Sequence, residues 1–169
     1  MVVQRGVNEQ EIAPMIRWSH DAGVILRFIE FMDVGETNGW GKQEVVTAEE
    51  ILAIVSGQFP VEEVPAAYPG EVARRWRFLD GAGEFGTISS VSQPFCGDCS
   101  RLRVSAEGKA FTCLFASEGA DLRNSLRSSS LDSDVSDFIR GLWGTRKDRY
   151  SEERGEVGRP KAEMSYLGG

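Results

Sequence analysis

The start of the chain changes from a helical to an extended pattern of apolar residues. Apolar side chains spaced three and four residues apart follow Asn8, a typical helix cap, and Gly23 is a typical stop. Residues 24–32 (VILRFIEFM) are nearly all apolar, as in a parallel strand buried on both faces. The sequence shows no parallel partner strand before this one. We therefore expect the start to be the end of a larger α/β sheet.

The rest of the pattern predicts a smaller region of mixed helices and strands. Thr47 and Glu50 form a capping box for a short helix that ends at Gly57, and the proline-rich residues 59–70 are expected to be extended. Strands are expected at 74–79 and 85–91, a hairpin at 101–105 and 110–115, and a helix at 131–147. The predicted fold class is α/β followed by α+β.

The composition excludes several classes of partner. The 169 residues include 26 Asp and Glu against 19 Lys and Arg, which gives a net charge of −7. This balance argues against nucleic-acid binding and against a polybasic membrane surface. No apolar run of about 18 residues is present, so no membrane span is predicted. The first residues also lack the apolar core of a signal peptide, so we expect a cytoplasmic protein.

Three cysteines, Cys96, Cys99 and Cys113, have the spacing C-x2-C-x13-C. An odd number of clustered cysteines indicates metal ligation rather than a disulfide framework. Three interpretations remain open from the residues alone. The cysteines could bind zinc with His20 as the fourth ligand, could be inert, or could hold an iron–sulfur cluster with one iron open to a ligand.

Charged residues next to the cysteines and in the predicted strand are candidates for ligand binding. Arg101 and Arg103 are two residues apart, so on a strand they share one face and suit phosphate oxygens. The equally weighted alternative is a solvated face that pairs with acids such as Glu107. Arg27 and Glu30 interrupt an apolar strand, where charges need a partner or a cavity.

Several segments resemble the C-terminal part of the GTP 3′,8-cyclase family. These radical S-adenosylmethionine enzymes, also called molybdenum cofactor biosynthesis protein A, start molybdenum cofactor biosynthesis. The resemblance runs from Val2 to Gly169 and is carried by RFIEFMDVG, NGW, PFCGDCSRLRVSAEGKAFTCLF and SYLGG. It implies that the three cysteines hold the family's second 4Fe-4S cluster, whose open iron binds the guanine of GTP.

The same resemblance implies roles for residues outside the cysteine motif. The segment formed by Arg101, Leu102 and Arg103 matches the GTP-binding segment of the family. Four further positions match a cavity-lining arginine, a contact to S-adenosylmethionine and a glycine tail that reaches the active site: these are Arg27, Met32, Gly168 and Gly169.

The sequence departs from the family at its N-terminal side. The family's first cluster uses C-x3-C-x2-C, which this sequence does not contain. We therefore expect residues 1–35 to be the end of a radical S-adenosylmethionine TIM-type barrel, and residues 36–169 to be a cap domain with the second cluster and the GTP site. Such a fragment cannot form the radical alone. It would need S-adenosylmethionine and a separate N-terminal half, or a homo-oligomer. The alternatives are a structural zinc module and another radical enzyme with an auxiliary cluster.

Overall fold

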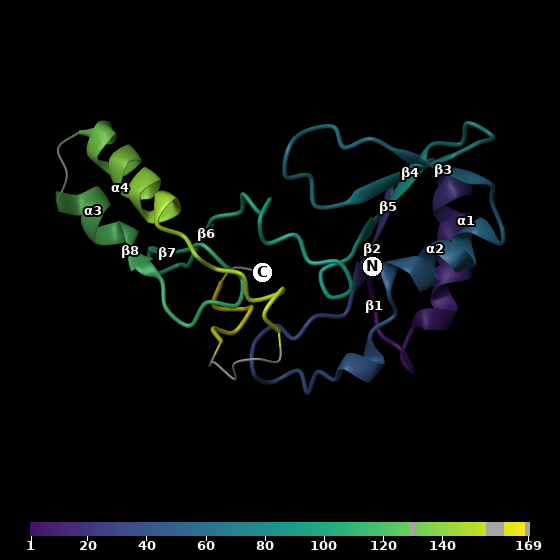
Figure 1. The fold of residues 1–169 in the computed structure, drawn as a ribbon, viewed down its shortest axis with the longest axis horizontal. Helices are drawn as coiled ribbons and strands as arrows, with labels where there is room; N and C mark the ends of the chain where they lie inside the picture. Colours follow the sequence, from purple (N-terminus) through teal and green to yellow (C-terminus); the bar gives the residue numbers. More distant parts are fainter. Residues whose placement is uncertain (129–130, 155–160, 168–169) are drawn as a thin grey trace. The chain divides into compact units, whose positions relative to one another are not determined.

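Five strands form the larger sheet of the chain, in the order β1-β2-β5-β4-β3 (Figure 1). β1, β2 and β5 run parallel, whereas β4 pairs antiparallel with both β5 and β3. The strands are β1 (Val2–Val3), β2 (Leu26–Glu30), β3 (Val61–Val64), β4 (Arg74–Phe78) and β5 (Glu84–Ile88).

The computed structural model describes residues 1–128, 131–154 and 161–167. Packing divides the chain into two units, each with its own internal contacts. The first unit contains Met1–Met32 and Trp40–Cys99, and the second contains Asp33–Gly39 and Ser100–Gly169. The structure is mixed α/β, as expected, and the predicted boundary between barrel and cap at residue 35 stays a prediction.

β1, helix α1 (Ile12–Ala22) and β2 form a parallel crossover unit. A short 3-10 helix, η1 (Glu9–Glu11), precedes α1. Gly23 ends α1 with φ 64°, as predicted, because glycine adopts this left-handed conformation without steric cost. The predicted cap is wrong: the side chain of Asn8 accepts from Gln4 N at 2.8 Å and donates to Val2 O at 2.9 Å.

The strand predicted over residues 24–32 was too long, and the expectation that both of its faces are buried was wrong. β2 covers only Leu26–Glu30, and Val24 and Ile25 before it are about half exposed. Within β2, Leu26 and Phe28 are buried while Arg27 between them is exposed. Among the described residues, the helices of the first unit cover one face of this sheet. Buried and more exposed side chains therefore alternate along β2 despite its apolar sequence.

The expectation that no parallel strand precedes β2 was also wrong. Val2 and Val3 of β1 pair with Ile29 and Glu30 of β2. A strand of two residues is too short to produce a pattern in the sequence, so only the pairing reveals it. On its other side, β2 is parallel to β5, which comes much later in the chain.

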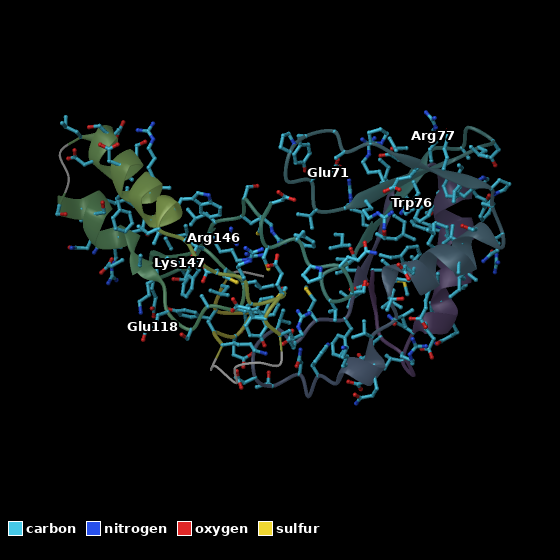
Figure 2. The ribbon with its side chains drawn as sticks, in the orientation of Figure 1. Glu71, Trp76, Arg77, Glu118, Arg146 and Lys147 are labelled. Atoms are coloured by element: carbon cyan, nitrogen blue, oxygen red, sulfur yellow. The ribbon has the colours of Figure 1, made fainter. Side chains whose placement is uncertain are left out.

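The core of the first unit lies between the sheet and two helices, α1 and α2 (Ala48–Ser56). The predicted capping box opens α2: Glu50 N donates to Thr47 Oγ1 at 3.2 Å, and Thr47 N donates to the Glu50 carboxylate at 2.8 Å. Neighbouring residues of β4 face opposite sides, so Trp76 is in the core and Arg77 is exposed (Figure 2). Before α2, a short 3-10 helix, η2 (Lys42–Glu44), follows the loop after β2.

The second unit contains a three-stranded antiparallel sheet, β6-β7-β8, and two helices. The predicted hairpin is confirmed but shorter than expected, and the last predicted helix is confirmed as α4. The sequence pattern did not predict α3 or β8. The elements are β6 (Arg103–Val104), β7 (Lys109–Phe111), β8 (Ala120–Asp121), α3 (Leu122–Ser128) and α4 (Asp132–Gly144). In the part of the chain that the structure describes, no helix has the length and apolarity that crossing a membrane requires.

Candidate functional site

The first two cysteines lie in a tight turn at the end of the first unit. Cys99 N donates to Cys96 O at 3.4 Å, and Asp98 N donates to Phe95 O at 3.3 Å. Both thiols are partly buried. The backbone turn therefore brings the two cysteine residues together without a disulfide, as a metal-binding C-x2-C segment requires.

Cys113 belongs to the second unit and was misplaced by the sequence pattern. β7 ends at Phe111, so Cys113 lies in the turn after the strand and not on it. Phe115 N donates to Cys113 Sγ at 3.5 Å. Such N–H···S hydrogen bonds stabilise a thiolate ligand and tune an iron–sulfur cluster.

A cavity of about 190 Å³ opens beside Cys113 within the second unit. Phe115 and Tyr150 line one part of it, and Lys147 and Arg149 contribute cationic side chains. Figure 2 labels Lys147 next to Arg146, where the chain leaves α4. A partly buried thiol with a backbone donor and a neighbouring cavity fits the chemistry of a cluster ligand. Within each unit, the described residues contain no group of three or more His, Cys, Asp or Glu side chains that could hold a metal ion.

The two arginines of the predicted nucleotide segment are not both on a strand. β6 begins at Arg103, so Arg101 precedes it and is exposed, while Leu102 and Arg103 are partly buried. Glu107, the acid offered as their partner in the alternative, accepts a hydrogen bond from the Tyr166 hydroxyl at 2.7 Å. The roles predicted for this segment stay predictions.

Arg27 projects from the face of the first sheet opposite the core. Its pairing partner in β5 is Gly86, where an added Cβ would lie 3.3 Å from Arg27 Cγ. The glycine thus leaves room for the stem of the arginine. Among the residues that the structure describes, the Arg27 guanidinium makes no hydrogen bond or ion pair, and its side chain is exposed. The role that the resemblance implies for Arg27, an arginine that lines the active-site cavity, stays a prediction.

Glu30 has a structural environment that differs from that of Arg27. It is fully buried and accepts hydrogen bonds from Ala48 N at 2.8 Å, Val91 N at 2.7 Å and Ser92 N at 2.8 Å. The Ser92 hydroxyl donates to the same carboxylate. Backbone donors therefore satisfy this buried charge, and it joins the first turn of α2 to the segment after β5.

The remaining predicted positions lie at the ends of segments. Met32 is partly buried and follows β2 by two residues. Gly168 and Gly169 lie outside the described residues. Sequence reasoning missed Asp33, which is buried next to Met32 and binds side chains near the end of the chain. The sequence shows only an aspartate after an apolar strand, which does not reveal its burial or its partners.

His20 is held by carboxylates, which counts against its role as a zinc ligand. Its Nε2 lies 2.8 Å from Asp80 Oδ2 and its Nδ1 lies 3.1 Å from Asp21 Oδ1. The ring stacks on Phe59 with centroids 4.4 Å apart and meets Phe78 edge-on at 5.0 Å. Both ring nitrogens are therefore engaged, and His20 joins the end of α1 to the turn after β4.

This arrangement predicts a pH-dependent contribution to stability. The hydrogen bond with Asp80, and then that with Asp21, raise the pKa of His20 above its ordinary 6.5. The contribution is therefore complete below that value and is lost as the pH rises through the higher folded pKa. We expect the difference in melting temperature between wild type and His20→Gln to be larger at about pH 5.5 than at about pH 9. A difference that is unchanged or larger at the higher pH would contradict this link.

The comparisons with known proteins identify the family of the chain. The chain belongs to the family described as Molybdenum Cofactor Synthesis C, whose model matches residues 24–152. It is 44% identical over 195 residues to a GTP 3′,8-cyclase from Acidothermus cellulolyticus, covering 99% of this chain and 54% of that protein.

Two further relatives carry the same name. The GTP 3′,8-cyclase of Synechococcus sp. (strain WH7803) is 48% identical over 170 residues, covering 99% of this chain and 48% of the relative. That of Xanthomonas axonopodis pv. citri is 48% identical over 171 residues, covering 99% and 50%. The chain spans about half the length of the curated relatives that it matches.

Proposed function

We propose that this chain is the C-terminal part of a GTP 3′,8-cyclase that acts in molybdenum cofactor biosynthesis. Its similarity over 99% of its length to relatives of that name supports this, together with the three cysteines that precede and follow an arginine pair. In the complete reaction, S-adenosylmethionine would supply the radical that removes a hydrogen from the GTP ribose, and the product would have a bond between that ribose carbon and C8 of guanine. Formation of the radical is assigned to a separate N-terminal half or to an oligomer partner.

The proposed cofactor is a 4Fe-4S cluster on Cys96, Cys99 and Cys113. Three thiols, none in a disulfide, form the donor set, and a backbone N–H bonds to one of them. A cluster with three protein ligands would supply a Lewis-acidic iron that can bind an atom of guanine.

The other predicted residues are assigned to binding and positioning. Arg101 and Arg103 bind oxygens of GTP, and Leu102 lies between them. Arg27 meets the substrate from the open face of the sheet, where its guanidinium is exposed. Met32 contacts S-adenosylmethionine at the end of β2. Residues 1–35 are proposed as the end of a radical S-adenosylmethionine barrel, and residues 36–169 as an iron–sulfur cap.

The zinc module is the weaker alternative. It needs His20 as the fourth ligand, but both nitrogens of that ring lie within hydrogen-bond distance of carboxylates. Another radical enzyme with an auxiliary cluster is also less supported. The relatives named above are GTP 3′,8-cyclases, and they cover both the arginine segment and the end of the chain.

A nucleotide titration tests the proposal directly. We expect Arg101→Ala and Arg103→Ala each to weaken binding of GTP to the reconstituted chain by about 10-fold to 100-fold, because each removes a charge-assisted hydrogen bond. Isothermal titration calorimetry measures the effect, with ATP as a second ligand to test the guanine preference.

Arg140→Ala provides the matched control for this titration. Arg140 is exposed on α4 and pairs with Asp137 at 3.2 Å. Its replacement should leave GTP affinity unchanged. If all three variants bind GTP as wild type does, or if the wild-type chain with its cluster does not bind GTP, the assignment of the arginine segment is wrong.

A further inference from the structure

Asp33 is the centre of a buried polar cluster in the second unit. Its side chain is 8% exposed, and it receives hydrogen bonds from three residues that follow α4. The Tyr150 hydroxyl donates to Oδ2 at 2.6 Å, and Arg154 Nε donates to Oδ1 at 2.8 Å. Lys161 Nζ donates to Oδ2 at 3.0 Å and to the main-chain oxygen of Asp33 at 2.8 Å.

The cluster buries two cations against one carboxylate. The side chains of Arg154 and Lys161 are 10% and 13% exposed. The rings of Phe115 and Tyr150 stack with centroids 4.4 Å apart, and both cations lie within 6 Å of these rings. The negative faces of aromatic rings offset part of the second positive charge. Asp33 and the stacked pair therefore both contact the two cations.

The protonation state of Asp33 agrees with this role. Burial by itself would raise the pKa of Asp33, but hydrogen bonds from Tyr150 and Lys161 and the charge of Arg154 outweigh it and lower the pKa. Asp33 is therefore ionised at neutral pH. Its replacement by asparagine would keep the shape of the side chain and remove the charge.

The loop that begins at Asp33 is joined to the end of the chain at further points. Lys161 N donates to the Glu36 carboxylate at 2.9 Å. Glu163 accepts from Glu36 N at 2.9 Å and from the Thr37 hydroxyl at 3.3 Å. Gly35 has φ 66°, and a Cβ there would lie 2.2 Å from Glu163 Oε2. Residues 33–39 and 161–163 are therefore closely packed.

The segment after Glu163 is also fixed in the second unit. Leu167 is 4% exposed, and its backbone N–H bonds to the oxygens of Glu163 and Met164. The Tyr166 ring meets Phe111 edge-on at 6.1 Å, and its hydroxyl donates to Glu107. The contacts thus continue to the residue directly before Gly168.

We propose that Asp33 is a positioning residue that holds residues 161–167, which directly precede the glycine pair Gly168 and Gly169 in the sequence, against the loop after Met32. The importance of that glycine pair rests on the function proposed above. The same aspartate directly follows Met32, the position assigned to S-adenosylmethionine.

Hydrogen exchange on the full chain tests this role. In Asp33→Asn, we expect amides of residues 161–167 to exchange at least about 10-fold faster at about pH 7. The reason is that the contacts that fix this segment are weakened, so the segment opens locally more often. Amides of α1 in the first unit should keep their wild-type rates. The exposed Asp132→Asn on α4 is the matched control and should leave residues 161–167 unchanged. Unchanged exchange in Asp33→Asn, or equal acceleration in both units, would overturn the proposal.

Two further variants separate positioning from a general loss of folding. Glu163→Gln weakens the second contact to the loop, because an amide has one acceptor oxygen and no charge, and it leaves Asp33 in place. It should therefore accelerate exchange over 161–167 even if Asp33→Asn does not fold. In Asp33→Asn, additional replacement of Lys161 by methionine should add little, because the two residues act as one unit. If the effects of Asp33→Asn and Lys161→Met on the exchange rates of residues 161–167 simply added, this coupling would be contradicted.

The result can be distinguished from failure of the proposed function. Exchange in residues 161–167 is measured without GTP or a cluster, so it reports on the anchor alone. If the wild-type chain does not bind GTP, but exchange over residues 161–167 depends on Asp33, the nucleotide role is disproved and the positioning role of Asp33 is retained. If the chain binds GTP, but exchange over residues 161–167 does not depend on Asp33, only the positioning role of Asp33 is disproved.

Discussion

Replacement of Cys113 by alanine is expected to remove most of the iron that the chain takes up on anaerobic reconstitution. The wild-type chain should bind about four irons and about four sulfides, as a 4Fe-4S cluster requires, and the variant less than about one of each. The physical reason is that three thiolates are the minimum donor set proposed, so loss of one leaves two sulfurs on a single turn. Colorimetric iron and sulfide analysis, together with zinc determination, measures the effect.

The matched control for Cys113→Ala is Ser117→Ala. Ser117 is exposed in the same segment, four residues further on, and should not change the metal content. About one zinc without sulfide in the wild-type chain would support the structural module instead. Iron content that does not depend on Cys113 would show that the third ligand is wrong.

Replacement of Glu30 by glutamine is expected to lower the free energy of unfolding of the first unit by about 3 kcal/mol. The carboxylate is fully buried and accepts three backbone N–H groups and a hydroxyl. An amide has the same shape but only one acceptor oxygen, and its NH2 group would face donors. Loss of a charge-assisted acceptor in a buried site leaves these donors without a full partner.

Urea denaturation, followed by the fluorescence of the chain's tryptophans, measures this loss. Glu49→Gln is the control, since Glu49 is exposed on the same helix that Glu30 helps to begin. That substitution should change stability by no more than about 0.5 kcal/mol. Equal denaturation midpoints for Glu30→Gln and wild type would show that the buried contacts contribute little.

Local signals predicted the features whose partners are close in sequence. Gly23 ends α1, and the capping box of Thr47 and Glu50 opens α2, because both depend on groups within a few residues. The Asn8 cap failed because the side chain found Gln4 and Val2 instead. For the Thr47 and Asn8 caps, the outcome was decided by which hydrogen-bonding group lies nearest in the folded chain.

Candidate site residues could be named from the sequence only where their residue types are unusual, and their roles stay predictions. Three clustered cysteines and an adjacent arginine pair are rare enough to be recognised, although Cys113 and Arg101 lie outside the strands expected for them. Asp33 could not be recognised, because its partners lie 117 to 128 residues away along the chain. No pattern within a short window carries such a pairing.

The sequence by itself determined the family, the candidate metal ligands and the ends of the local helices, since these depend on residue type and short spacing. The tertiary structure decided which charges are buried and what satisfies them. Glu30 and Arg27 lie in the same apolar strand, yet one binds backbone N–H groups from segments 18 and 62 residues away while the other is exposed. The reason is that burial of a charge depends on what packs against each face of the sheet, which only the folded chain brings together.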